Sequence, residues 1–311
     1  MRSFVLVLAA LALTAGLRAD QGTTAASFLK LDTSPRAIAM ADTYAGIADD
    51  VNAIEYNPAG EAYLTQKEVT VMYAAWFQDI YYTYGALAWP ASWGTISLDF
   101  FYLNAGSFDG YAFDSTGKPV STGTFTASDM YGTLAYSRKI LSFLSAGLSV
   151  KMINESIASY STGSVAVGLS GLYQTPVKGL SLGLNIANLG PAEGFQQGYP
   201  LPINVRFGAG YKPTDYITVG MDYDQPIETA GIWSVGGEYA YRHTLYIRMG
   251  YRYQGAVDYN ETYDGYGPAV AAGMNLGVGL KLYKNYAADY SYSPYGFLGT
   301  SHRISLSLNF D

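Results

Sequence analysis

Apolar and polar residues alternate with a period of two along most of the chain after residue 66. Near its end, Ile304, Leu306 and Leu308 are each followed by a polar residue. Successive side chains of a strand point to opposite faces, so this alternation predicts strands with one apolar and one polar face. Fourteen strands are predicted, over residues 67–77, 80–89, 93–103, 125–138, 143–155, 160–174, 180–189, 203–212, 216–224, 231–241, 244–253, 267–281, 284–293 and 300–310.

The connections between these segments alternate in length. Links such as 90–92 and 138–142 are short, whereas links such as 104–124 and 190–202 are mostly long. Short turns at one end and longer loops at the other are typical of bacterial outer-membrane barrels. We therefore predict an all-β fold, a transmembrane antiparallel up-and-down β-barrel of about fourteen strands over residues 66–311. A soluble β-sandwich would also alternate, but fourteen strands exceed an ordinary sandwich.

The polar face of this barrel is expected to line the lumen, since a charge facing the middle of a bilayer costs about 2–4 kcal/mol. The charged residues predicted to point inward are Asp99, Lys151, Arg206, Asp222, Glu238, Arg248, Arg252, Lys281, Asp289 and Arg303. We expect many of them to pair in a salt-bridge network. Arg206, Arg248 and Arg252 are also candidates for binding the carboxylate of a ligand.

Glycine also recurs on the inward face. The predicted inward glycines are Gly208, Gly210, Gly220, Gly250, Gly277 and Gly279. Inward glycines allow strands to bend or let another backbone approach closely. They could equally serve only to reduce crowding in a narrow barrel.

The composition is rich in aromatic residues, with 30 tyrosines and 4 tryptophans against 14% charged residues. Tyrosine and tryptophan favour the membrane–water boundary because their rings are partly apolar. Tyr81, Tyr82 and Tyr84 near one end of a strand, and Trp89 and Trp93 near the other, are therefore predicted to form aromatic girdles.

The first nineteen residues have the pattern of a secretory signal peptide. A charged start at Arg2 precedes an apolar stretch over 4–15 and small residues up to Ala19. The apolar stretch is shorter than a spanning helix needs, although an uncleaved anchor is the alternative. The chain contains no cysteine, so disulfides, thiolate chemistry and attachment of lipid to cysteine are excluded.

Residues 20–65 differ from the barrel and are predicted to form a small helical plug. Ser34-Pro35 is a helix-start signal, and small and apolar residues then recur at helical spacing as far as Ala45. Asp49-Asp50 is expected to cap a second short helix over 51–55. Fourteen strands enclose a wide lumen, which this segment would close.

The segment from Ser34 to Gly60 resembles the amino-terminal signature of the PorV/PorQ (UPF0164) outer-membrane proteins, relatives of the long-chain fatty-acid transporter (FadL) group. The matching residues are Arg36, Ala37, Met40, Ala48, Asp49, Asp50, Asn57, Pro58, Ala59 and Gly60. The chain departs from the pattern at Ala39 and Ala41, where the family has glycine, and at Tyr56, where it has tryptophan.

This resemblance implies a bacterial outer-membrane location and two alternative functions. A FadL-like barrel would be a channel for hydrophobic small molecules such as long-chain fatty acids, with a plug and a route through a gap in the wall. A PorV-like barrel would be an accessory of type IX secretion and would bind exported proteins or secretion components. A structural barrel without transport is a third possibility. Aromatic and aliphatic residues of the long loops are candidate first contacts for an apolar ligand, a protein or outer-membrane lipid: Phe108, Tyr111, Phe113, Phe125, Phe195, Tyr199 and Leu201.

Other function classes find little support. His243 and His302 are the only histidines, and neither lies in a set of metal ligands. No nucleophile motif or phosphate-binding glycine loop is present, so we expect neither an enzyme nor a bound cofactor or metal. A net charge of −7 and a pI near 4.8 argue against nucleic-acid binding, which requires a basic face.

Overall fold

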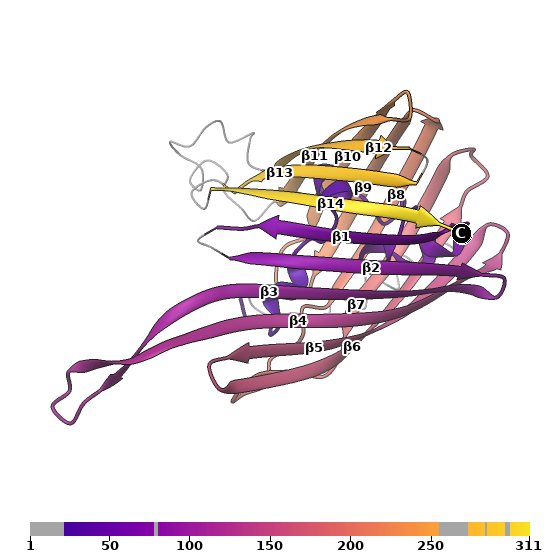
Figure 1. Cartoon of the computed structure of the whole chain (residues 1–311). Coiled ribbons are helices and arrows are strands. Elements are labelled where there is room, and N and C mark those ends of the chain that lie inside the picture. Colours follow the sequence, from indigo (N-terminus) through magenta and orange to yellow (C-terminus); the bar gives the residue numbers. More distant parts are fainter. Residues whose placement is uncertain (1–21, 78–79, 255–272, 284, 296–298) are drawn as a thin grey trace.

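The fourteen predicted strands are all present and close into one antiparallel barrel (Figure 1). The computed structural model describes residues 22–77, 80–254, 273–283, 285–295 and 299–311. The predicted signal peptide and the start of the strand predicted over 267–281 lie outside these residues. Strands β1 and β14 pair in register from Lys67 with Phe310 to Ala75 with His302, and this pairing closes the barrel.

Each strand pairs with its neighbours in sequence. The strands are β1 (Lys67–Ala75), β2 (Tyr81–Ala91), β3 (Gly94–Phe113), β4 (Pro119–Leu141), β5 (Leu144–Ile157), β6 (Tyr160–Gln174), β7 (Leu180–Leu189), β8 (Asn204–Thr214), β9 (Ile217–Pro226), β10 (Ile232–Tyr241), β11 (Leu245–Gln254), β12 (Met274–Leu282), β13 (Tyr286–Pro294) and β14 (Thr300–Phe310).

The burial of side chains is inverted relative to a soluble protein. In β9, Asp222 is buried inside the barrel, whereas Val219 and Met221 are exposed on its outer face. Half of the ten charged residues predicted to point inward are buried in this way. They are Asp99, Asp222, Glu238, Arg248 and Arg303. An apolar outer face around a polar interior is what a bilayer requires of a barrel. Within the described residues, no helix is long and apolar enough to cross a membrane.

The longest hairpin corrects a predicted loop. Strands β3 and β4 extend to Phe113 and from Pro119, so most of the predicted link 104–124 is strand. Only the turn at 114–118 remains, where the Asp114 side chain accepts hydrogen bonds from the main chain. The extension of this hairpin projects beyond the rest of the barrel (Figure 1). The glycines and polar residues of this extension interrupt the alternation of apolar and polar residues, so the sequence did not predict strands there.

The aromatic girdle prediction was partly wrong. Trp89 and Trp93 are exposed on the outer face, as predicted. Tyr82 and Tyr84 are buried inside the barrel, because the period of two places them on the opposite face from Tyr81 and Trp89.

Short helices inside the barrel form the plug. They are η1 (Ser27–Lys30), α2 (Pro35–Ala39), α3 (Ala53–Tyr56) and η2 (Pro58–Tyr63). Helix α2 contacts β11 to β14, whereas η2 contacts β2 to β6 on another side of the lumen. As predicted, Ser34 caps α2: its hydroxyl accepts a hydrogen bond of 3.3 Å from the Ala37 amide.

Two details of the predicted plug were wrong. Helix α2 ends at Ala39 rather than near Ala45, because Ala41 and Asp42 adopt left-handed backbone conformations. Helix α3 begins at Ala53 with Asn52 at its N-cap, so Asp49 and Asp50 do not cap it.

Inward glycines bring the plug main chain into direct contact with the barrel wall. A Cβ atom added at Gly183 would lie 1.8 Å from the carbonyl oxygen of Ala45, and one at Gly236 would lie 2.1 Å from that of Met40. Gly210, Gly220 and Gly250 face main-chain atoms of plug residues 40–47 in the same way, and Gly277 faces the Cβ atom of Ala39. Both interpretations of the inward glycines are thus represented. Gly210, Gly220 and Gly250 admit another backbone, whereas Gly208 and Gly279 leave room for the side chains of Asp222 and Arg248.

We predict that Gly236→Ala destabilises the protein, because its methyl group must displace the Met40 carbonyl. The expected loss is about 1–3 kcal/mol, typical of overpacking. Gly237→Ala is the matched control, since a Cβ there meets nothing closer than 3.7 Å and a change within about 0.5 kcal/mol is expected. Denaturant unfolding in detergent measures both, and equal stability of the two variants would contradict the close contact.

Candidate functional site

Two cavities lie on opposite sides of the plug in the part of the lumen that the structure describes. A chamber of about 500 Å³ lies toward the long loops and is lined on the plug side by Leu29, Ile54 and Tyr56. A smaller cavity of about 220 Å³ lies toward the short turns and is lined by Arg36, Asp50 and Asn52 among others. We call these the outer chamber and the inner cavity. The plug residues between them are the candidate functional site, because any path from one cavity to the other would have to pass them.

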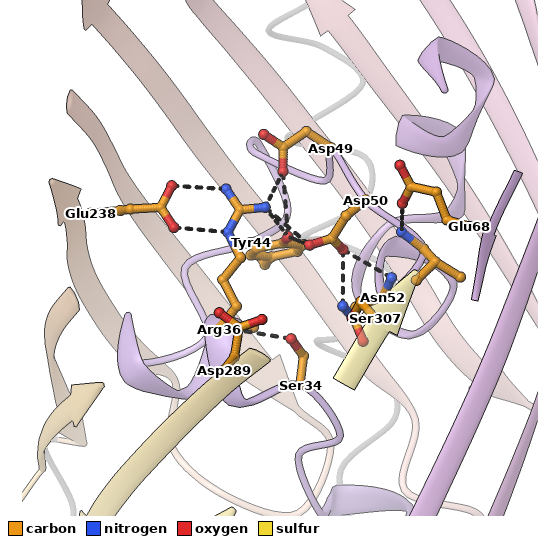
Figure 2. A network of polar contacts seen from close by, with 12 residues as sticks. Ser34, Arg36, Tyr44, Asp49, Asp50, Asn52, Glu68, Glu238, Asp289 and Ser307 are labelled. Carbon is orange, nitrogen blue, oxygen red and sulfur yellow. Dashed lines mark hydrogen bonds and ion pairs between the residues drawn. The ribbon is translucent and has the colours of Figure 1, made fainter. Parts of the chain in front are cut away.

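Arg36 is the centre of the polar network that holds the plug (Figure 2). Its guanidinium donates two hydrogen bonds of 3.0 Å to the two carboxylate oxygens of Glu238 on β10. It also donates to Asp49 at 2.6 Å, Asp50 at 3.0 Å and the Tyr44 hydroxyl at 2.8 Å. A planar guanidinium is suited to this bidentate geometry. The Arg36 side chain thus connects helix α2, Tyr44 and the Asp49-Asp50 pair of the plug to strand β10 of the wall.

Two of the acidic partners of Arg36, Asp49 on the plug and Glu238 on the barrel wall, are each paired with a second basic side chain. Burial alone would raise the pKa of Asp49, but Arg36 and then Lys212 outweigh it and hold that pKa well below its usual range. On the wall, Arg248 donates to Glu238 at 2.6 Å and to Asp289 at 2.5 Å. The network therefore runs from the plug through β10 and β11 to β13, and confirms part of the predicted lumen salt bridges.

A second contact joins the wall to the plug main chain. One carboxylate oxygen of Asp222 on β9 accepts hydrogen bonds of 3.0 Å from the amides of Tyr44 and Ala45. Met40, another residue of the predicted plug motif, is fully buried with Ala37, Tyr44 and Tyr56. These side chains form the small apolar core of the plug.

The Asn57-Pro58-Ala59-Gly60 motif fixes the end of the plug to strands β5 and β6. The side-chain amide of Asn57 donates hydrogen bonds to the main-chain carbonyls of Ala45 at 2.6 Å and Gly171 at 3.2 Å. The Ala59 amide donates to the Ser170 hydroxyl, and the Ala59 carbonyl accepts from Ser145. Gly60 packs on the Ala48 carbonyl, which a Cβ atom would approach to 2.0 Å. The geometry thus requires glycine at this position.

The three arginines proposed as ligand-binding residues do not share one site. Arg206 and Arg252 line the outer chamber, whereas Arg248 lines the inner cavity. Each is already paired with acidic side chains. Arg206 donates to Asp224 at 2.9 Å, and Arg252 contacts Asp42 of the plug.

Sequence reasoning missed several polar contacts of the plug. Lys151 on β5 pairs with Glu55 at 2.8 Å, and Lys30 pairs with Glu228 at 2.5 Å. The partners lie far apart in the chain, so no local pattern reveals them. Glu61, which was also missed, directly follows the Asn57–Gly60 motif and is fully buried.

The barrel wall has one irregular place beside the outer chamber. Neighbouring strands remain hydrogen-bonded around the described barrel, but the β6–β7 register shifts between Val167 and Leu169. Val167, Gly168, Ala187 and Asn188 at this shift line the outer chamber. The route through a gap in the wall that the resemblance implies therefore stays a prediction.

The long-loop residues and the histidines take up varied positions. Phe195 and Tyr199 are exposed, but Leu201 is fully buried and cannot be a first contact for a ligand. His243 stacks on Tyr216, and His302 contacts Tyr290. In the part of the chain that the structure describes, no group of three or more histidine or acidic side chains is arranged to hold a metal ion.

Solved structures of several bacterial transporters share this fold. The Ralstonia pickettii toluene transporter TbuX superposes with a TM-score of 0.63 at 13% identity, over 91% of this chain and all of that one (100%). A Pseudomonas aeruginosa FadL homologue gives 0.58 at 12% identity, over 90% and 98% of the two chains. The Pseudomonas putida toluene transporter TodX gives 0.57 at 12% identity with the same coverage. At these identities the likeness shows the fold.

No protein-family model matches this chain, and no curated protein matches its sequence. The PorV/PorQ resemblance therefore stays a prediction.

Glu61 generates a testable pH dependence. Burial raises the pKa of its carboxyl group well above the usual value, and the Ser97 hydroxyl, at 2.5 Å, only partly offsets this. A raised acid pKa stabilises the fold below the unfolded pKa, and this contribution is lost as pH rises through the folded pKa. We predict that Glu61→Gln lessens the loss of stability between pH 5 and pH 9 in denaturant titrations. A slope identical to that of the unsubstituted protein would show that Glu61 is already ionised in the fold.

Proposed function

We propose that this protein is a FadL-like outer-membrane channel that takes up hydrophobic small molecules. The observation that carries the proposal is the plug itself, which lies inside a fourteen-stranded barrel with a chamber between it and the long loops. The barrels of similar fold include transporters described as acting on toluene. Among the described residues, the plug separates the two cavities, so passage would require the plug to shift or a route through the wall.

The lining of the outer chamber fits a ligand with an apolar body and a polar end. Its apolar part includes Leu29, Leu31, Ile54, Ala166 and Ile232. Its polar part includes Arg252, whose side chain is 34% exposed, compared with 12% for Arg206. Arg252 is thus the more accessible partner for a carboxylate, which would compete with Asp42 for it. Long-chain fatty acids meet this description, and a sideways exit would require the wall to open, for which we propose the β6–β7 register shift beside the chamber.

The proposal predicts that the folded, purified protein binds a long-chain fatty acid. Replacing Arg252 by Met should weaken binding about tenfold or more, the effect of losing one charge-assisted hydrogen bond. Arg138→Met, at an exposed position near a short turn, is the matched control and should leave affinity unchanged. Fluorescent fatty-acid displacement measures all three proteins.

The absence of binding to the unsubstituted, correctly folded protein would overturn the proposed function. If the Arg252→Met protein bound the fatty acid as tightly as the unsubstituted protein, the proposed function would stand, but the contact between Arg252 and the carboxylate would be wrong.

A second candidate function is a PorV-like role in holding exported proteins at the cell surface. It is favoured by the β3–β4 hairpin, which projects beyond the barrel and exposes Tyr111, Phe113 and Val120. Exposed apolar side chains on a projecting element are typical of a binding surface.

This second function predicts that Tyr111→Ser with Phe113→Ser abolishes co-purification of an exported protein or secretion component from native membranes. Fatty-acid binding should remain, because both residues lie outside the outer chamber. Recovery of no such partner by the unsubstituted protein would count against this function.

A further inference from the structure

The outer wall of the barrel carries an apolar groove that the proposed transport route does not use. It has a volume of about 460 Å³ and lies on the outer face of β1, β2, β3 and β14. Val71, Tyr73, Phe100, Ile304 and Leu306 form its sides. Gly85 forms its floor, directly across from Val71 on one side and Phe100 on the other. The groove exists because the band of large outward side chains is interrupted at this glycine.

The neighbours of Gly85 do not require a glycine. A Cβ atom there would meet nothing closer than the Thr70 carbonyl oxygen at 3.7 Å and a Val71 methyl at 4.0 Å. This differs from the inward Gly183 and Gly236, where an added Cβ atom would lie about 2 Å from a carbonyl oxygen of the plug. Open space in front of Gly85 is therefore the structural consequence of glycine at this position.

A polar cluster of Gln66, Lys67, Trp89 and Asp311, which we call the seat, lies at the short-turn end of the strands that form the groove. The Lys67 ammonium lies 4.4 Å from the centre of the Trp89 ring and donates a hydrogen bond of 2.8 Å to the main-chain oxygen of Asp311. Gln66 donates to the Asp311 carboxylate at 3.3 Å. The seat thus presents one cation and one carboxylate side by side, next to an aromatic ring typical of the membrane boundary.

The distance between seat and groove matches one leaflet of a bilayer. Lys67 and Val71 are four residues apart on β1, a separation of about 13 Å along a strand. Half of a hydrocarbon core is about 15 Å thick. A lipid with its headgroup at Lys67 would therefore place an acyl chain in the groove.

We propose that the groove and the seat together bind one aminophospholipid with a zwitterionic headgroup. Its phosphate would pair with Lys67, its ammonium with the Asp311 carboxylate, and one acyl chain would fill the space in front of Gly85. A lipid is favoured over a second copy of the chain because the seat offers charges of both signs at headgroup depth. The inference rests on the membrane-spanning barrel and is independent of transport.

The experiment is native mass spectrometry of the purified full-length protein, titrated with phosphatidylethanolamine in mild detergent. Gly85→Leu should weaken binding about tenfold, the effect of excluding about two methylene groups from burial. Lys67→Gln should weaken it by a similar factor through loss of the phosphate contact. Gly237→Leu is the matched control, because Gly237 is also outward-facing with nearest neighbours at 3.7–3.8 Å, and its binding should not change.

Several results would overturn the proposal. One is that Gly85→Leu binds the lipid as tightly as the unsubstituted protein, and another is that Gly237→Leu loses as much affinity as Gly85→Leu. A third is that the unsubstituted protein forms dimers that Gly85→Leu dissociates whether or not lipid is present. Equal affinity for phosphatidylglycerol would reject the ammonium contact with Asp311. Gly85→Ala provides a milder variant in case leucine impairs folding, and it should bind with intermediate affinity.

Discussion

The contact of the plug main chain with glycines of the wall is the constraint on which the rest of the structure depends. Plug residues 40–47 run so close to β7 to β11 that a methyl group added at Gly183, Gly236 or Gly250 would overlap main-chain atoms of the plug. This proximity brings the amides of Tyr44 and Ala45 to Asp222, and it brings Arg36 to Glu238. The polar network secures the plug, but the glycines create the space in which it can form.

The barrel could be predicted almost completely from the sequence, because its signal repeats in every strand. Period-two alternation located all fourteen strands and assigned the lumen charges to the correct face. It failed where another effect dominated locally. The β3–β4 extension lies outside the apolar band, so its alternation is weak, and Tyr82 and Tyr84 pack inside because register overrides the preference of tyrosine for the membrane boundary.

The site was predicted only in part, because its contacts join residues distant in the chain. The plug motif directed attention to Arg36, Asp49, Asp50 and Asn57, all of which hold the plug in place. The sequence could not show that Asp49 and Asp50 bind Arg36 rather than cap a helix. It also could not separate Arg248 from Arg206 and Arg252, since all three share the inward pattern while the plug divides the lumen between them.

The central claim is that the docked plug seals the barrel, and its most direct test is the permeability of proteoliposomes to a small polar solute. The unsubstituted protein should be nearly impermeable. Arg36→Met should be leaky, because removing one partner of a buried ion pair costs about 3–5 kcal/mol and leaves Glu238, Asp49 and Asp50 repelling one another. Arg138→Met should remain sealed. A folded Arg36→Met barrel as tight as the unsubstituted protein, or an unsubstituted protein that conducts like an open pore, would contradict this account.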